Sequence, residues 1–477
     1  MKAVFLKAII VFISLFTGSQ YLNAQSKADA NAVEKFVQQT MADNNIVGGT
    51  VTLFTLEEDL LTKGFGKTSR AGEAIDTHTT FNIGSLTKSF TGIAILQLRD
   101  AGLLNLNLPV VNYLPAFRTK NKELSNKITI LHLLNHSSGI TTFQGNRTQS
   151  ADYYAMDALE FAVSDYQNIK LNHNPGDHFE YSNANYQILG LLIEKLSDNS
   201  YENYITDHIL KPLAMNDSGF EPVSNSAIPH RYVFGFATPF DKKISRTVLS
   251  QGGIFSSAAD MKKYLKAILV KDTALISQRS YDEIFNGSQP GSAQMGFAGW
   301  EMGPLNYKGN QVKAFWHNGS NPGFKSSMLI APELGLGTFV STNTDGNYDI
   351  NSSSPFVFGP SYMMMGYPPP NPSPISGFLT ILLWLIPIGL SYSLFQKFRK
   401  PFKKKTMRQL IISSLLTILI CYFTAIFLPG YFGNVGLKST IRFEPEVGYL
   451  LLSVTLLATV KMLANWLLNF TKANNKT

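Results

Sequence analysis

Cysteine is almost absent from this sequence, because the chain of 477 residues contains only Cys421. A disulfide within one chain needs two thiols, and a cysteine-based metal site needs more than one, so the sequence excludes both. The folded part must therefore be stabilised by its hydrophobic core alone. Charged residues are also scarce, at 16% of the chain.

The net charge of +8 is concentrated in one short segment, residues 397–408, which reads Lys-Phe-Arg-Lys-Pro-Phe-Lys-Lys-Lys-Thr-Met-Arg. This segment separates two long apolar runs. A basic loop in such a position is typical of a membrane surface, where it contacts anionic lipid head groups. We therefore expect membrane lipids as partners and no nucleic acid.

Residues 1–24 have the layout of a secretory signal peptide. Lys2 and Lys7 precede an apolar run that covers residues 8–16, and the small residue Ala24 ends the segment. This layout predicts that the chain after residue 24 is exported. The alternative is that the segment is retained as an anchor helix.

Three apolar runs lie near the other end of the chain, at about residues 376–396, 409–428 and 447–470. Each is long enough to cross a hydrocarbon core about 30 Å thick, which predicts a membrane region at 376–470 with three transmembrane helices. The positive-inside rule places the basic loop between the first two runs in the cytoplasm. The preceding part of the chain then lies outside the cytoplasm, in the periplasm or at the cell surface.

The pattern of apolar residues between these ends changes twice. Helical spacing predicts a helix at 29–44, two β-rich runs follow within 50–65, and mostly helical spacing continues from 86 to 211. Further strands are predicted within 313–342. Strands at both ends with helices between them favour an α/β (α+β) fold for residues 25–350, in which one sheet is assembled from sequence-distant strands around an inserted helical lobe.

Residues 351–375 are rich in proline, glycine and serine, and include the run Pro-Pro-Pro-Asn-Pro-Ser-Pro at 368–374. Such a stretch has little to bury and tends to be extended. We therefore expect a linker to the membrane here, and no helix is evident in residues 348–365.

The first candidate catalytic pair is Ser85 and Lys88, which form the only Ser-x-x-Lys of the chain. They begin an apolar periodic stretch, so in a helix both side chains share one face about one turn apart. An amine in that position can accept the proton of a hydroxyl that is otherwise a poor nucleophile. The pair predicts a covalent serine hydrolase, and the alternative is the polar first turn of an ordinary helix.

Tyr181 and Asn183 form a second motif at the start of an apolar helical run. A tyrosine can act as a base or proton shuttle if a nearby cation lowers its pKa, and an asparagine can both donate to and accept from a substrate amide. A structural tyrosine at the start of a helix would give the same pattern.

A third motif, His317-Asn318-Gly319-Ser320, is predicted to lie where a strand ends in a tight turn. Gly319 lets the strand edge approach a ligand closely, and the backbone N–H of Ser320 could form an oxyanion hole with that of Ser85. His317 could contact a substrate carboxylate or stabilise the tyrosine, or it could be an ordinary histidine of an edge strand.

Two other arrangements have little support in the sequence. The chain has no Gly-x-Ser-x-Gly, which argues against the nucleophile elbow of an α/β-hydrolase. His132 and His136 have no carboxylate at metal-ligand spacing. We therefore expect neither a metal nor a cofactor.

In order and in character, the three motifs resemble those of the penicillin-recognising serine hydrolases, and above all the group of class C β-lactamases, D-alanyl-D-alanine carboxypeptidases and related esterases. The resemblance covers about residues 30–345, and other stretches that share it are 81–88, 128–139, 210–215, 252–257 and 322–324. It implies an antiparallel sheet flanked by helices, with an all-helical lobe inserted.

The resemblance also implies a role for each motif residue. Ser85 would be the nucleophile, and Lys88 and Tyr181 would share proton transfer, either of them being the general base. The residues implied in substrate binding are Asn183, His317, Gly319 and Ser320.

Two features depart from the family pattern. His317 stands where true β-lactamases usually carry lysine, whereas the esterase and peptidase branches often carry histidine, so the resemblance points away from β-lactam hydrolysis. The helix that the family places after the last strand is not evident.

The sequence thus predicts a membrane-tethered serine hydrolase outside the cytoplasm. Its expected substrate is a small molecule or peptide, either a D-amino-acid peptide or a small ester, cleaved through an acyl-enzyme on Ser85. The rival is a penicillin-binding or peptidoglycan-sensing module without turnover, which passes occupancy of the site to the membrane spans.

Overall fold

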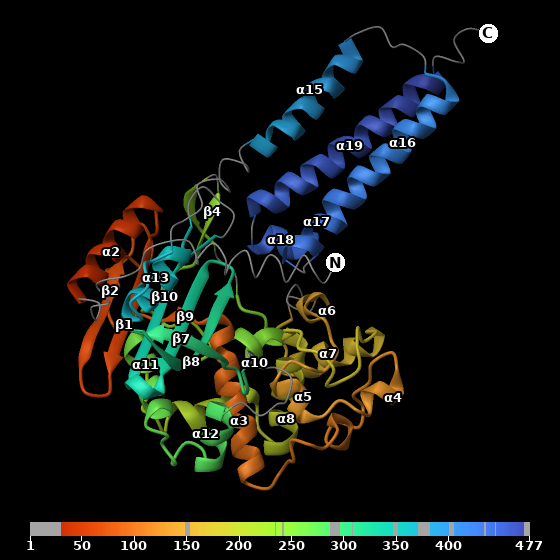
Figure 1. The fold of residues 1–477 in the computed structure, drawn as a ribbon. Coiled ribbons are helices and arrows are strands. Elements are labelled where there is room, and N and C mark those ends of the chain that lie inside the picture. Colours follow the sequence, from red (N-terminus) through yellow and green to blue (C-terminus); the bar gives the residue numbers. More distant parts are fainter. Residues whose placement is uncertain are drawn as a thin grey trace.

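The computed structural model describes residues 30–147, 153–233, 235–240, 243–286, 296–307, 309–346, 352–370, 382–399, 405–433, 436–443 and 445–471. The expected signal peptide lies outside these residues. Figure 1 shows an α/β body, with a sheet on one side and a helical lobe on the other, and a group of long helices beyond it.

Six antiparallel strands form the central sheet in the order β2-β1-β10-β9-β8-β7. Their bounds are β1 Gly48–Thr55, β2 Asp59–Gly66, β7 Glu301–Tyr307, β8 Asn310–Asn321, β9 Phe324–Ala331 and β10 Leu336–Thr342. Gly49 of β1 pairs with Thr342 of β10, so the sheet joins strands from opposite ends of the body. This confirms the predicted antiparallel sheet of sequence-distant strands.

Helices cover both faces of this sheet. The helices α2 (Ala30–Asp43) and α13 (Ser354–Met364) pack on one face, where Val51 of β1 joins their apolar cluster. On the other face lie α3 (Thr87–Asp100), α11 (Ala258–Leu269) and α12 (Gln278–Asn286), and Phe54 of β1 belongs to their core. The alternation of side chains along β1 thus divides the body into two apolar layers.

The helical lobe is built around α8 (Asn183–Ser197), whose buried residues pack against α3, α5, α7 and α10. The other helices of the lobe are α4 Lys122–Ser125, α5 Ile130–Leu134, α6 Thr142–Arg147, α7 Ala158–Ser164, α9 Tyr201–Ile205 and α10 Leu249–Gly252. Short strands form two smaller sheets, of order β11-β4-β5 and β3-β6, with bounds β3 Phe81–Asn82, β4 His230–Val233, β5 Phe236–Pro239, β6 Phe255–Ser256 and β11 Thr344–Asp345. The predicted inserted lobe is confirmed, and it brings the start of α8 beside the start of α3.

The helix α13 corrects the sequence analysis, which expected a linker from residue 351 and no helix in 348–365. Phe356 and Val357 are fully buried between α2 and the sheet, with the Phe356 ring against Gly49. Pro355 fits the first turn, where a helix needs no backbone N–H donor. The helix was missed because its proline, serine and glycine are typical of linkers, although its apolar residues are buried.

The chain stays attached to the body after α13. The hydroxyl of Tyr367 accepts a hydrogen bond from the backbone N of Asn306 in β7, at 2.7 Å. The candidate tether therefore begins no earlier than the proline run at 368–374.

Within the part of the chain that the structure describes, two helices are long and apolar enough to cross a membrane, Met407–Gly430 and Glu446–Phe470, with mean hydropathy 2.4 and 1.8. The first consists of α16 (Met407–Tyr422), the π-helical turn Phe423–Phe427 and the start of α17 (Leu428–Gly433), and the second lies within α19 (Pro445–Thr471). The helix α18 (Leu437–Phe443) lies between them in the chain, and α16 and α19 lie side by side in Figure 1. The first predicted span, 376–396, is described only in part, as α15 (Leu385–Arg399). A third span therefore stays a prediction.

We expect Phe356→Ala to destabilise the body by about 3–5 kcal/mol, because it empties a fully buried ring site between α13, α2 and the sheet. The measurement is thermal unfolding of the full-length protein in detergent. Phe236→Ala is the matched control, since Phe236 is 68% exposed, and it should leave the melting temperature nearly unchanged. Equal melting temperatures for both variants would contradict the packing of α13.

Candidate active site

Ser85 lies in a 3₁₀ turn, Gly84–Leu86, that leads directly into α3. The side-chain oxygen of Asn82 accepts a hydrogen bond from the backbone N of Gly84, at 3.0 Å. Gly84 has a φ of +53°, and a Cβ at this position would lie 2.7 Å from the backbone N of Ser320. Only glycine therefore lets this turn lie against the end of β8.

Lys88 is fully buried in the first turn of α3. Its Nζ donates to the Oγ of Ser85 at 3.0 Å and to the backbone O of Gln251 at 2.9 Å. The rings of Tyr181 and Tyr186 flank the amine, with centroids 5.0 and 5.7 Å from Nζ. Burial holds the pKa of Lys88 well below its usual value, because desolvation disfavours the charged form. A neutral amine here can accept the proton of Ser85.

Tyr181 contacts the same serine from the segment that precedes α8. Its hydroxyl donates to the Oγ of Ser85 at 3.0 Å. Burial raises the pKa of Tyr181 above its usual value, so the phenol keeps its proton. The ring of His136 packs on that of Tyr181, with centroids 4.5 Å apart, and burial lowers the pKa of His136, with a further contribution from Lys88. Both rings are therefore neutral at neutral pH.

His317 lies on β8 across from Tyr181, with ring centroids 6.2 Å apart. Its Nδ1 lies 2.7 Å from the backbone O of Asn318, so this nitrogen carries the proton and donates. Burial, together with Lys88, lowers the pKa of His317 to about 3. The histidine that replaces the family's lysine thus brings no positive charge to the site.

Gly319 and Ser320 bring the end of β8 against the turn that holds Ser85. A Cβ at Gly319 would collide with the backbone O of Ile83, so only glycine permits this approach. The hydroxyl of Ser320 donates to a side-chain oxygen of Asp345 at 3.3 Å. The structure thus unites Ser85, Lys88, Tyr181, His317, Gly319 and Ser320 in one place.

Asn183 is the first residue of α8, and its side-chain contacts differ from those of the other predicted site residues. Its Nδ2 donates to the Oδ1 of Asn146 at 2.8 Å. Its Oδ1 is buried and has no hydrogen-bond partner among the described residues. An unpaired buried acceptor costs about 1–3 kcal/mol, so this oxygen is the atom of Asn183 that gains most from a substrate donor.

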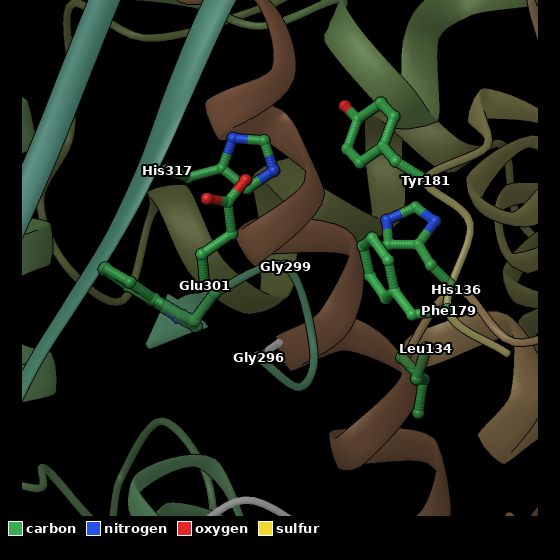
Figure 2. Close-up of a pocket in the computed structure, with 9 residues that line it drawn as sticks. Leu134, His136, Phe179, Tyr181, Gly296, Gly299, Glu301 and His317 are labelled. Atoms are coloured by element: carbon green, nitrogen blue, oxygen red, sulfur yellow. The ribbon is translucent and has the colours of Figure 1, made fainter. Parts of the chain in front are cut away.

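A pocket with about 260 Å³ of space free of protein atoms, part of it open solvent, lies beside Tyr181 and His317. It is lined by Leu134, His136, Phe179, Tyr181, Gly296, Gly299, Trp300, Glu301 and His317. Figure 2 shows His317 and Glu301 on one side and Tyr181, His136 and Phe179 on the other.

Sequence reasoning predicted only Tyr181 and His317 among these lining residues, and two of those it missed, His136 and Glu301, carry titratable groups. His136 belongs to the stretch 128–139 that carried part of the family resemblance, so that stretch was the available signal. Glu301 gave no signal, because β7 contains Gly303 and Pro304 and was not predicted as a strand.

Known sequences match the body of the chain. A sequence model of the family described as Beta-lactamase matches residues 33–353. The chain is 28% identical over 324 residues to Protein flp of Staphylococcus aureus (strain N315), covering 66% of this chain and 63% of that protein. It is 32% identical over 271 residues to the putative penicillin-binding protein PbpX of Bacillus subtilis (strain 168), covering 55% of this chain and 64% of that protein. The matched segments thus span less than two thirds of either relative.

Solved structures share the fold. The octameric penicillin-binding protein homologue from Pyrococcus abyssi gives a TM-score of 0.59 at 26% identity, covering 75% of this chain and 82% of that one. A class C beta-lactamase in complex with cefoxitin gives a TM-score of 0.57 at 19% identity, covering 67% and 95%, and this likeness concerns the fold alone. The sequence match to the family ends before the apolar helices.

We expect Gly84→Ala to slow the reaction of Ser85 with a fluorophosphonate by about 100-fold or more, since the added Cβ displaces the backbone N of Ser320 from the turn. The measurement is the rate of covalent labelling. Gly102→Ala is the matched control: its φ is +75°, but no atom lies within 4 Å of the added Cβ. It carries similar backbone strain without the collision and should react at the normal rate. Equal rates for both variants would refute the role given to Gly84.

Proposed function

Because the chain belongs to the beta-lactamase family, we propose that it is a membrane-tethered serine hydrolase that acts outside the cytoplasm through an acyl-enzyme on Ser85. The observation that carries the proposal is the pair of contacts at the Ser85 Oγ, with the amine of Lys88 and the hydroxyl of Tyr181 both at 3.0 Å. A serine with an amine and a phenol in hydrogen-bond reach has the partners that an activated nucleophile requires.

The opposite pKa shifts of these partners support a division of roles. The pKa of Lys88 is lowered and that of Tyr181 is raised, so the amine is the better acceptor for the serine proton. Lys88 takes this proton as Ser85 attacks the carbonyl carbon. Tyr181 is protonated in the free enzyme, where it donates to the oxygen of Ser85. As the tetrahedral intermediate collapses, Tyr181 gives its proton to the leaving group, and the proton that Lys88 took from Ser85 replaces it, so the acyl-enzyme is left with a neutral amine and a neutral phenol. Water then hydrolyses the acyl-enzyme.

The backbone N–H groups of Ser85 and Ser320 are assigned to the oxyanion. The close approach of Gly84 to the end of β8 supports this assignment, because it seats the turn of Ser85 directly against the backbone N of Ser320. The unpaired oxygen of Asn183 is assigned to a donor on the substrate, such as an amide N–H.

The neutral state of His317 supports a substrate other than a β-lactam. A lysine in its place would present a cation to a substrate carboxylate, whereas an imidazole with a pKa of about 3 does not. We therefore assign the enzyme to small esters and D-amino-acid peptides.

The two long apolar helices and the basic segment 397–408 support the membrane tether. With that segment in the cytoplasm, the body lies on the opposite side of the membrane. The run of prolines after Tyr367 joins the body to the membrane region.

We expect a fluorophosphonate or a fluorescent penicillin to label the full-length protein and Ser85→Ala to abolish the label. The exposed Ser164→Ala in α7 is the control and should be labelled normally. Absence of label on the unmodified protein would refute the acyl-enzyme. Since one relative is a putative penicillin-binding protein, the second outcome of interest is a lasting penicillin label without hydrolysis of any ester, which would favour a binding or sensing module.

The rate of acylation by a neutral p-nitrophenyl ester should rise with pH as Lys88 loses its proton. Because burial lowers the pKa of Lys88, the rise should be complete well below pH 10, where an ordinary lysine is still largely charged. The raised pKa of Tyr181 predicts no fall in rate as pH approaches 10. The measurement is the pH profile of kcat/KM, and a rise centred near pH 10 would contradict Lys88 as the base. Lys88→Arg, which keeps the charge, should lose about 100-fold or more.

A further inference from the structure

The pocket beside Tyr181 and His317 has an unusual charge balance. Of the described residues that line it, Glu301 is the one with a formal charge at neutral pH. His136 and His317 also line it, but burial lowers the pKa of both, so both are neutral. The formal charge of the pocket lining is therefore negative.

The carboxyl of Glu301 is held in a fixed position at the start of β7. Its Oε2 accepts a hydrogen bond from the indole N–H of Trp316 at 2.8 Å. Trp316 is also the partner of Glu301 in the pairing of β7 with β8, so backbone and side chain fix the carboxyl together. Figure 2 shows this carboxyl on the same side of the pocket as His317, across from Phe179 and Tyr181.

Among the described residues, no ion pair of Glu301 with a lysine or arginine is formed, and Trp316 is the group that stabilises its charge. Burial raises the pKa of Glu301, and the negative charge of Glu301 in turn contributes to the raised pKa of Tyr181. A partly buried carboxylate that lacks a cation is stabilised when a cation binds beside it.

We propose that Glu301 binds a positively charged group of the substrate, so that the enzyme prefers esters or amides that carry an ammonium group to those that carry a carboxylate there. The inference rests on the proposed hydrolase function and specifies its substrate class. A charge-assisted hydrogen bond from the ammonium to Glu301 Oε1 provides the attraction, and the same carboxylate repels an anionic group.

The test uses three p-nitrophenyl esters of nearly equal length, those of 6-aminohexanoic acid, heptanoic acid and adipic acid, which end in ammonium, methyl and carboxylate. We expect the full-length protein to hydrolyse them with kcat/KM in that order. Glu301→Gln keeps an acceptor for the Trp316 indole but loses the charge. It should lower the ammonium-to-methyl ratio by ~10-fold and raise the carboxylate-to-methyl ratio.

Glu57→Gln is the matched control, because Glu57 is exposed in the turn between β1 and β2 and its replacement changes the net charge equally. Its ratios should equal those of the unmodified protein. A second measurement does not depend on which end of the substrate enters the pocket. Alkylammonium ions from methyl to hexyl should slow the fluorophosphonate labelling of Ser85 more than the matching alcohols do. The Glu301→Gln variant should show no such difference between amines and alcohols.

The outcomes separate the two proposals. Hydrolysis of the methyl-terminated ester with unchanged ratios in Glu301→Gln, and equal protection by amines and alcohols, would overturn the role of Glu301 while the hydrolase function stands. Failure to hydrolyse any of the three esters would instead contradict the hydrolase function. In that case the role of Glu301 is judged by the labelling experiment alone. If the alkylammonium ions protect Ser85 no better than the alcohols do, the inference about Glu301 is overturned.

Discussion

The burial of one amine, that of Lys88, is the constraint on which the rest of the site depends. Water around this lysine would restore its charge, and Ser85 would then lack the base that we propose for it. The protein excludes that water with the rings of Tyr181 and Tyr186 from the lobe, and α10 provides the backbone O of Gln251 as the remaining hydrogen-bond acceptor. The packing of the lobe against α3 therefore determines the chemistry of the nucleophile as directly as the side chains that contact it.

The same desolvation determines the charge of the surroundings. Burial lowers the pKa values of His136 and His317, and the charge of a protonated Lys88 would lower them further, so both rings are neutral in either state of Lys88. A site with a neutral base, a protonated phenol and two neutral imidazoles holds little positive charge against which an anionic group could be bound. The presence of His317 in place of a lysine therefore lowers the positive charge of the site.

How well the site residues could be predicted depends on how far apart in the sequence the interacting residues lie. Ser85 and Lys88 are one helical turn apart, so local spacing alone paired them, whereas Tyr181 and His317 joined them through the family resemblance. Glu301 lies in the pocket because β7 pairs with β8. Since β7 was not predicted as a strand, this pairing could not be predicted from the sequence.

The fold was predictable to the same extent. The β-rich runs of the central strands and the helical spacing of α3 and α8 are local, so the sheet and the lobe were anticipated. The helix α13 was not, because its burial comes from α2 and β1, which lie some 300 residues earlier and whose contact no local pattern reports.

The pairing of β1 with β10 has a consequence for the order in which the chain acquires its structure. The hydroxyl of Thr342 donates to the backbone O of Gly48, 294 residues before it. Closing so long a loop requires nearly the whole body to be present, whereas α3, α8 and the hairpins β7-β8-β9-β10 need only their neighbours. The strands β1 and β2 can pair with each other early, but the other edge of β1 has to stay unpaired until synthesis has passed residue 342.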